Sequence, residues 1–283
     1  MRWIKAEPIS PMTNELLEKQ YWDNFWSSIQ LPMEIDSKSQ SSIARGVFDI
    51  FERYVPKKPA GKVLEIGGAP GRFLTYWAKA GCEVHALDYS STGCQKTREN
   101  FQLLSLPVTV HEMDVRGASK QLPQFDIVYS LGFIEHFHDL DVVLEEHHKL
   151  LKPGGLLFIG VPHFMDVFWP ILSRFAPHIT GGHVRKTLSP RSWRSLRDSL
   201  GMKEVFEGFV GGFDPGPARS VMREEWQRHP QNKTRSARFL CALIETYLRA
   251  YQASNRFFPA LNGWTKINSS LWSVYAMGVF QKV

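Results

Sequence analysis

The sequence is poor in cysteine, has no long apolar run and contains no internal repeat, and each absence removes a class of protein. Its three cysteines form no Cys-x-x-Cys pair and leave one thiol over under any disulfide pairing, which argues against a disulfide framework or a cysteine-built zinc site. No stretch of about 18 uncharged apolar residues occurs, so the sequence predicts no membrane-spanning helix. The first residues lack the apolar core of a leader peptide, and we therefore expect a cytoplasmic protein.

The composition is that of an ordinary globular protein, but its charge is unevenly distributed. Hydrophobic residues make up 43% of the 283 residues and charged residues 22%, which excludes wholesale disorder. The formal net charge is +6, yet thirteen Arg or Lys and only six Asp or Glu fall between positions 171 and 240, so the rest of the chain is nearly neutral. This basic region suits an anionic substrate, a membrane surface or RNA, or is a solvated face, because its charges are scattered.

From about residue 43 onward, short apolar runs alternate with amphipathic stretches. The expected strands are 62–66, 83–87, 108–111, 125–129, 156–161, 203–210 and 272–283. The expected helices between and around them are 43–54, 72–80, 91–104, 139–151, 189–200 and 236–252. This alternation predicts an α/β fold with a doubly wound, seven-stranded, mostly parallel sheet and helices on both faces.

The same pattern divides the chain into four parts. A helical lid and linker (1–42) precede the core (43–212), a helical insertion (213–270) follows, and a final core strand (271–283) completes the sheet. The Gly- and Pro-rich run from residue 211 to 217 is expected to end the sixth strand. Aromatic residues of the insertion, including Phe258 and Trp264, make it a candidate substrate region.

A glycine-rich turn follows the first strand of the core, in the order Glu65-Ile66-Gly67-Gly68-Ala69-Pro70-Gly71. Glycines let the backbone bend sharply and approach a ligand, and the next helix presents unpaired N–H groups. The spacing does not fit the Gly-x-Gly-x-x-Gly of dinucleotide sites, and an acid before the turn suits an ammonium group better than a phosphate. Glu-x-Gly-x-Ala-x-Gly resembles the first motif of the class I S-adenosylmethionine-dependent methyltransferases, with Ala69 where glycine is commoner.

Three further motifs resemble that family in its own order. Asp88-Tyr89 resembles the end of the second strand, whose acid accepts hydrogen bonds from the ribose hydroxyls. Asp114-Val115 resembles the exit of the third strand, where the acid binds the adenine amino group, and Leu150 to Leu157 resembles the family's "LKPGG" turn. The resemblance spans about residues 40 to 212 and implies a Rossmann-like methyltransferase fold with S-adenosylmethionine as cofactor. It implies a cofactor site made by Glu65, Gly67, Gly68, Ala69, Gly71, Asp88, Tyr89, Asp114, Val115 and Ser130.

Candidate catalytic residues follow the fourth strand. Glu135-His136 resembles the "EH" segment of small-molecule methyltransferases, including ubiquinone-type O-methyltransferases. Because the sulfonium methyl is already electrophilic, the protein needs only to hold a nucleophile in line, exclude water and, where required, remove a proton. His136 has the right intrinsic pKa range for a general base near neutral pH, or it organises the turn instead. His163, beyond the fifth strand, is the second candidate. Some members of that family carry an acid three residues before the Glu, and this acid is part of a metal site. Because this chain has Gly132 there, which has no side-chain ligand, we expect no metal.

The acceptor is expected to be a small molecule. Tyr21, Trp22 and Trp26 lie on an amphipathic helix that begins at Thr13 or Asn14, and we expect them to cover the methyl group as part of the substrate site. The Pro-Pro and Pro-Cys motifs of adenine and cytosine methylases are missing, which disfavours nucleic acid. The sequence thus predicts methyl transfer to an oxygen or nitrogen of a small organic, lipid-like or natural-product acceptor. The alternatives are an RNA or protein methyltransferase and a non-catalytic cofactor-binding subunit; peripheral membrane contact stays open, and the sequence does not indicate an oligomeric state.

Overall fold

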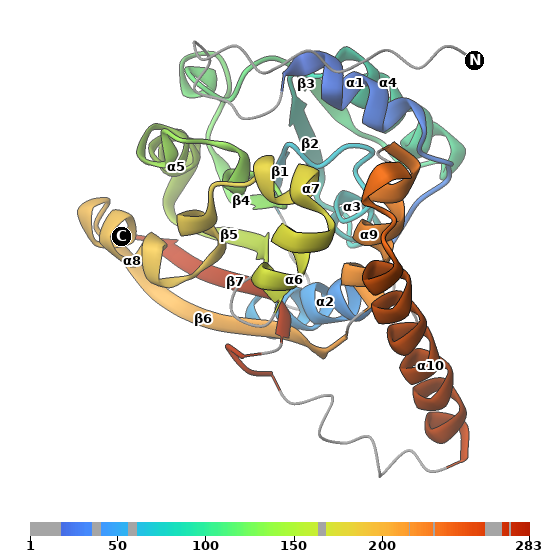
Figure 1. The fold of residues 1–283 in the computed structure, drawn as a ribbon. Coiled ribbons are helices and arrows are strands. Elements are labelled where there is room, and N and C mark those ends of the chain that lie inside the picture. Colours follow the sequence, from blue (N-terminus) through green and yellow to red (C-terminus); the bar gives the residue numbers. More distant parts are fainter. Residues whose placement is uncertain are drawn as a thin grey trace.

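A seven-stranded sheet forms the centre of the chain, with the strand order β3-β2-β1-β4-β5-β7-β6 (Figure 1). The strands are β1 (Lys62–Ile66), β2 (Glu83–Asp88), β3 (Thr109–Glu112), β4 (Phe125–Leu131), β5 (Leu151–Pro162), β6 (Met202–Phe213) and β7 (Ser273–Lys282). Strands β1 to β5 pair in parallel, whereas β7 runs antiparallel between β5 and β6. The predicted doubly wound, mostly parallel sheet is therefore confirmed.

The computed structural model describes residues 18–35, 41–55, 61–163, 168–214, 216–228, 230–257, 268–271 and 273–283. The predicted helix start at Thr13 or Asn14, most of the linker before residue 42, and the aromatic residues Phe258 and Trp264 lie outside these described residues.

Helices cover both faces of the sheet. The α-helices of the described residues are α1 (Lys19–Ser27), α2 (Ser42–Tyr54), α3 (Leu74–Lys79), α4 (Ser91–Leu103), α5 (Leu140–Lys149), α6 (Phe168–Phe175), α7 (Pro177–Gly181), α8 (Arg191–Ser199), α9 (Gly216–Arg228) and α10 (Arg235–Phe257), of which α1 packs on α4 and α10 on α9. No helix in the described part of the chain is both long enough and apolar enough to cross a membrane.

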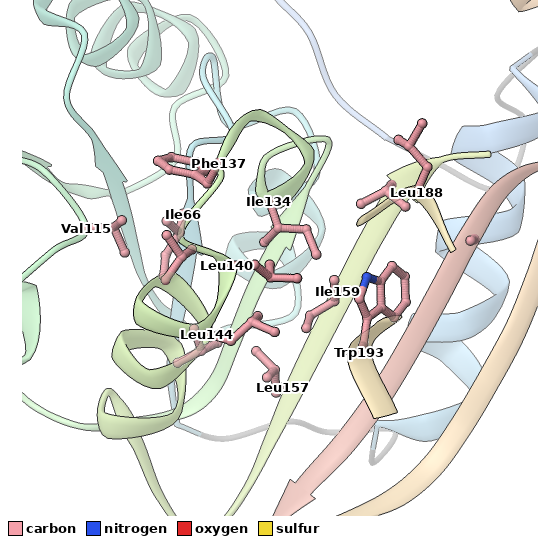
Figure 2. Packing of buried hydrophobic residues seen from close by; sticks show 14 of the residues in the cluster. Ile66, Val115, Ile134, Phe137, Leu140, Leu144, Leu157, Ile159, Leu188 and Trp193 are labelled. Atoms are coloured by element: carbon pink, nitrogen blue, oxygen red, sulfur yellow. The ribbon is translucent and has the colours of Figure 1, made fainter. Parts of the chain in front are cut away.

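Two hydrophobic clusters separate according to the alternation of side chains along the strands. Val63 of β1 packs with Phe51 of α2 and Trp77 of α3 on one face. The next residue, Leu64, belongs to the opposite cluster, which also contains Leu144 of α5. Figure 2 shows this second cluster, in which the indole of Trp193 on α8 and the side chains of α5 lie against the sheet. The central strands β4, β5 and β7 are mostly apolar on both faces because each face of the sheet is covered by helices.

The structure corrects two expected breaks in strands. The run from residue 211 to 217 does not end β6 at Gly211, because the strand resumes and Phe213 pairs with Ser273 after a register shift. Gly211 and Gly212, with φ of +86° and +56°, form the irregularity, so the two glycines build a bulge within the strand. Similarly, the "LKPGG" turn lies inside β5: Leu151 pairs with Phe125, and pairing resumes at Leu156.

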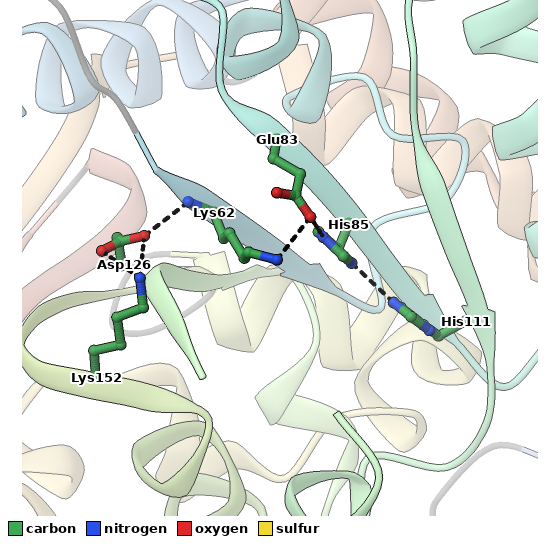
Figure 3. Close-up of polar contacts among 6 residues, drawn as sticks. All are labelled: Lys62, Glu83, His85, His111, Asp126 and Lys152. Atoms are coloured by element: carbon green, nitrogen blue, oxygen red, sulfur yellow. Dashed lines mark hydrogen bonds and ion pairs between the residues drawn. The ribbon is translucent and has the colours of Figure 1, made fainter. Parts of the chain in front are cut away.

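A polar network ties neighbouring strands together at the amino-terminal end of β1 (Figure 3). The Asp126 carboxylate accepts hydrogen bonds from the Lys62 backbone N–H at 2.8 Å and from Lys152 Nζ at 2.9 Å. The Lys62 ammonium reaches Glu83 at 2.9 Å, and Glu83 also lies 2.9 Å from His85 Nε2. These charges lie at the opposite end of β1 from the glycine-rich turn, so they hold the sheet's register and leave its other end for a ligand.

Candidate active site

A pocket opens at the carboxyl ends of β1, β2 and β4, where the strand order changes direction. Ligands in doubly wound sheets bind in this position. The pocket encloses about 390 Å³ of empty space, part of it open to solvent. It is lined by Trp22, Trp26, Gly67, Asp88, Tyr89, Gly132, Phe133, His136 and Phe137. The structure thus brings together six residues that the sequence singled out, from both the lid and the strand ends.

The glycine-rich turn is held tightly against its neighbours. Gly67 has φ of +68°, and a Cβ at this position would lie 2.1 Å from the Phe133 ring, so no larger residue fits. A Cβ on Gly68 would lie 2.2 Å from Cδ of Glu65, which places that carboxyl directly beneath the turn. Ala69, in contrast, is not among the residues with positive φ, so an alanine is compatible with the backbone there.

Glu65 is an acid buried beneath the glycine-rich turn. Its side chain is 1% exposed, and neither carboxylate oxygen has a well-formed hydrogen bond within the described residues. Burial raises the pKa of Glu65 to about 8, and the nearby Tyr129 hydroxyl offsets this only in part. A ligand ammonium would favour the ionised carboxylate, and the amino-acid part of S-adenosylmethionine carries such a group.

Asp88 ends β2 with its side chain turned into the pocket. Its Oδ1 accepts a hydrogen bond from the Ser90 backbone N–H at 2.9 Å, and the side chain is 7% exposed. Burial raises the pKa of Asp88 to about 6, against the lowering effect of the Ser90 and Ala69 N–H groups, and Asp23 raises it further. The carboxylate is therefore ionised near neutral pH and acts as an acceptor, which fits the ribose hydroxyls of an adenosyl ligand.

Helix α1 closes the pocket from the side of β2. Asp23 Oδ1 accepts hydrogen bonds from Ser90 Oγ at 2.5 Å and from the Thr92 N–H at 3.2 Å, at the start of α4. Trp26 packs on Gly93, where a Cβ would lie 2.8 Å from Cδ1 of the indole. The aspartate therefore fixes the helix to the same loop that carries Asp88.

The tryptophans on α1 lie over the candidate catalytic segment. The Trp22 ring meets the His136 ring edge-on with centroids 5.0 Å apart, and it stacks on Trp26 at 6.0 Å. Tyr21 packs edge-on against Trp22 at 5.2 Å but does not line the pocket. The lid thus forms an aromatic wall facing His136.

His136 is neutral, and its tautomer is fixed by a backbone carbonyl. Nδ1 lies 2.7 Å from the Gly182 oxygen, so this nitrogen carries the proton and Nε2 is left as an acceptor. Burial, and next His183, lower the pKa of His136 to about 3. Glu135 is 1% exposed with Oε1 4.0 Å from His136 Nε2, and burial raises the pKa of Glu135 to about 8. Near neutral pH this neighbour carries a proton.

Within the described part of the chain, one group of three side chains has a geometry that could hold a metal ion. One ligand atom each from Glu135, His136 and His183 lies within 4.8 Å of the others. The Nδ1 atom of His183 lies 2.6 Å from the Ile179 oxygen, the arrangement that histidine ligands commonly adopt. One carboxylate and two imidazoles suit zinc or a similar ion. A metal would first have to displace the proton of Glu135. The absence of a metal stays a prediction.

Asp114 and Val115, two of the predicted cofactor residues, do not line the pocket. Asp114 is exposed and accepts hydrogen bonds from the Arg116 backbone N–H at 2.7 Å and side chain at 3.2 Å. Val115 is 3% exposed and packs in the core cluster of Figure 2. Arg116 also makes a two-pronged ion pair with Asp139, at 2.9 and 3.0 Å, so it connects the β3 exit to α5.

Two further predicted residues make contacts within the protein. Ser130 Oγ lies 3.1 Å from His147 Nε2, and because His147 Nδ1 donates to the Val143 carbonyl, the serine is the donor. His163 is 3% exposed, with its two ring nitrogens 3.2 and 2.8 Å from backbone oxygens of Leu188 and Ser270. Neither residue lines the pocket, and their assigned roles stay predictions.

The sequence did not assign a site role to Asp23, Phe133 or Phe137. Phe133 and Phe137 line the pocket, with ring centroids 4.7 Å apart. Their position on either side of Glu135-His136 was the available signal. Asp23 had none, because its partner Ser90 is 67 positions away in the chain.

Residues 64–157 match the protein-family model described as "Methyltransferase domain". The chain carries a class I S-adenosylmethionine-dependent methyltransferase domain. The match begins in β1 and includes the glycine turn, Asp88 and Glu135-His136.

Relatives of the methyltransferase domain include enzymes that act on oxygen and on nitrogen. The chain is 28% identical over 99 residues to a ubiquinone biosynthesis O-methyltransferase of Chelativorans sp., covering 35% of this chain and 39% of that protein. The chain is 26% identical over 200 residues to a glycine/sarcosine/dimethylglycine N-methyltransferase of Actinopolyspora halophila, covering 65% of this chain and 34% of that protein. The matches thus span well under two thirds of either relative's length.

Solved structures extend the likeness of fold to almost the whole chain. The crystal structure of the [4+2]-cyclase SpnF superposes with a TM-score of 0.58 at 15% identity, over 97% of both chains. The likeness concerns the fold alone, and that neighbour is named a cyclase. The chemistry of the methyltransferase domain must therefore be argued from its site.

Proposed function

We propose that this chain transfers the methyl group of S-adenosylmethionine to an oxygen or nitrogen of a small organic acceptor. The observation that carries the proposal is the shared pocket: Gly67, Asp88 and His136 line one cavity, beneath Trp22 and Trp26. The position of this cavity at the switch point of the sheet, within the methyltransferase domain, supports the same conclusion.

Two acids on the donor side of the pocket would bind different parts of S-adenosylmethionine. The Asp88 carboxylate would bind the ribose hydroxyls, and the buried Glu65 carboxyl beneath Gly68 would compensate the ammonium group. When bound, S-adenosylmethionine supplies a methyl group that is already electrophilic because the sulfur carries a positive charge. The protein therefore needs to supply binding, alignment and a dry site.

The acceptor side would place the nucleophile at His136. Because Nδ1–H is donated to the Gly182 carbonyl, Nε2 can accept a hydrogen bond from the O–H or N–H of the acceptor. This hydrogen bond would orient the acceptor so that a lone pair of its own oxygen or nitrogen points at the methyl group. Burial disfavours a lasting imidazolium ion. Full proton transfer to His136 would therefore require that Glu135 has first released its own proton to solvent, so that the carboxylate 4.0 Å away stabilises the positive ring.

Aromatic side chains would keep water away from the reacting atoms. Trp22 and Trp26 close one side of the pocket, and Phe133 and Phe137 close the other. Such walls with a few polar groups are typical of sites for small molecules. The relatives' names include both O- and N-methylation, so we propose either atom as the acceptor. None of the three cysteines forms a disulfide, which fits a reducing compartment such as the cytoplasm.

Calorimetric titration with S-adenosylhomocysteine, the demethylated product, tests the donor site. Asp88→Ala removes an acceptor of two charge-assisted hydrogen bonds and should weaken binding by about 100-fold or more. Asp141→Ala, an exposed acid on α5, is the matched control and should bind normally. Unchanged binding by Asp88→Ala would refute the assignment.

Methyl transfer is tested with labelled S-adenosylmethionine and a panel of small hydroxylated, carboxylated and amino acceptors. His136→Gln should lower turnover while leaving the affinity for S-adenosylhomocysteine within a few-fold of wild type, because the ring faces the acceptor side. Cofactor binding without turnover on any acceptor class would favour a non-catalytic subunit instead.

A further inference from the structure

Helix α10 turns one continuous face away from the protein. At about 100° per residue, its exposed positions fall on a single side of the helix. We call this the α10 outer face; it consists of Arg235, Ser236, Arg238, Phe239, Ala242, Leu243, Thr246, Arg249 and Ala250. Figure 1 shows α10 on the outside of the molecule, with its C-terminal half extending beyond α9 (Gly216–Arg228).

The opposite face fixes the orientation of the helix. Ala237 and Cys241 are buried, at 0% and 4% exposure, and the Tyr247 ring meets Phe213 of β6 edge-on at 5.6 Å. An ion pair between Glu245 and Arg223 joins α10 to α9. Because these contacts hold one side of α10 against the protein, the outer face points to solvent.

The outer face carries charge of one sign only. Arg235, Arg238 and Arg249 are all exposed there, and the described part of α10 contributes no acid to this face. The acid of α10, Glu245, is the partner of Arg223 at the edge of the packed side. Of the two acids on α9, Glu225 is buried and accepts a hydrogen bond from Asn232 at 2.6 Å, and Glu224 is half-buried.

Two large apolar side chains stand beside these arginines. Phe239 is 67% exposed and Leu243, one turn further, is 51% exposed. A solvated helix face normally carries polar residues at such positions. An apolar strip parallel to an arginine strip matches a boundary at which an apolar and an anionic environment meet.

We propose that the α10 outer face docks on an anionic lipid surface. The three arginines extend over 14 positions, about 21 Å of helix, and a helix lying in the interface would place them at the level of the lipid phosphates. Phe239 and Leu243 would then enter the boundary of the acyl chains. The face is a convex helix surface, which suits a bilayer better than a protein partner, because an exposed helix docks on a protein by entering a groove. This inference concerns location and does not depend on the proposed methyl transfer.

Co-sedimentation with vesicles tests the proposal directly. The full chain should bind vesicles of phosphatidylcholine containing about 30% phosphatidylglycerol at low salt, and not vesicles of phosphatidylcholine alone. Each arginine near such a surface contributes about fivefold in affinity, so Arg235→Gln/Arg238→Gln/Arg249→Gln should lose roughly 100-fold. Phe239→Ser/Leu243→Ser should lose about tenfold or more, with a weaker salt effect than the arginine variant.

Matched controls separate this face from a general effect of charge or hydrophobicity. Arg53→Gln/Arg98→Gln/Arg191→Gln removes the same charge from exposed positions on α2, α4 and α8 and should retain binding. Leu103→Ser/Val142→Ser removes exposed apolar side chains elsewhere, 55% and 40% exposed, and should also retain binding. All five positions are exposed, so thermal unfolding should confirm intact folds.

The proposal is overturned if the wild type fails to bind anionic vesicles at low salt. It is equally overturned if neutral vesicles bind as well, or if the control triple variant loses as much affinity as the α10 variant. Binding of the same face to RNA or to an acidic protein, without binding to vesicles, would replace the lipid surface by another partner.

Discussion

Replacing Asp88 by asparagine should make the protein more stable while it destroys the donor site. Burial raises the pKa of this carboxyl from 3.8 to about 6, so the folded state binds a proton that the unfolded state has already lost between these two values. Stability therefore falls as the pH rises through this window and stays reduced above it. An ionised Asp88 is a cost that the fold carries at neutral pH.

The size of this cost follows from the shift. A little over two pK units correspond to about 3 kcal/mol at neutral pH. Asparagine keeps an oxygen for the Ser90 N–H, which Asp88 binds at 2.9 Å. The NH2 that replaces its second oxygen cannot accept a hydrogen bond from the neighbouring Ala69 or Tyr89 N–H groups, and one lost acceptor costs about 1–1.5 kcal/mol. The net expectation is a gain of about 1–2 kcal/mol, or about 4 °C in Tm for a chain of this size.

Thermal unfolding without ligand, at pH values from about 7.5 to 5, provides the assay. The advantage of Asp88→Asn should shrink by about 1.4 kcal/mol over this range, because wild-type Asp88 takes up its proton. Its affinity for S-adenosylhomocysteine should fall by about 100-fold at pH 7.5. Asp141→Asn should change neither quantity. A variant less stable than wild type at pH 7.5, or an advantage independent of pH, would refute the reasoning.

Three further substitutions test other parts of the site. Gly67→Ala should cost about 2 kcal/mol or more in urea unfolding, because φ is +68° and the new methyl would meet Phe133; a near-neutral effect would contradict this geometry. Asp23→Ala should speed release of S-adenosylhomocysteine about 5- to 30-fold in stopped-flow fluorescence, because α1 loses two hydrogen bonds to α4; an unchanged rate would show that α1 does not gate the pocket. Arg116→Gln should lower the free energy of unfolding by about 1–2 kcal/mol, because it removes the paired contact with Asp139. The exposed control Arg98→Gln should change it by no more than about 0.5 kcal/mol in the same urea measurement.

The sheet could be predicted because its strands carry their own signal. β1 was expected at 62–66 and has those bounds, since both faces of the strand are buried and three of its five residues, Val63, Leu64 and Ile66, are apolar. The helices α6, α7 and α9 were not foreseen. Pro177 begins α7 and Gly216 begins α9, and these residue types predict loops where local sequence alone is considered. The local sequences of α6, α7 and α9 do not predict helices, and the contacts of α9 with α6 and α7 stabilise all three in the folded protein.

The site was predictable where it is local and not where it depends on distant segments. Gly67 directly follows β1 and Asp88 ends β2, so a motif along the chain locates both in the lining of the pocket. The hydrogen-bond partners of Ser130 and His136 could not be predicted from a motif along the chain. Ser130 bonds to His147 on α5, and His136 to the carbonyl of Gly182, 46 positions later. Such pairings depend on how helices pack on the finished sheet.

The insertion of β7 between β5 and β6 has a consequence for synthesis on the ribosome. β6 forms its ladder with β7 alone within the described sheet, so a nascent chain that ends anywhere before residue 273 exposes the edges of both β5 and β6. Unpaired strand edges invite association with other chains. The interval in which translation covers residues 214 to 272 is therefore the period of greatest risk for misassembly, and chaperone capture during that interval would protect the growing polypeptide.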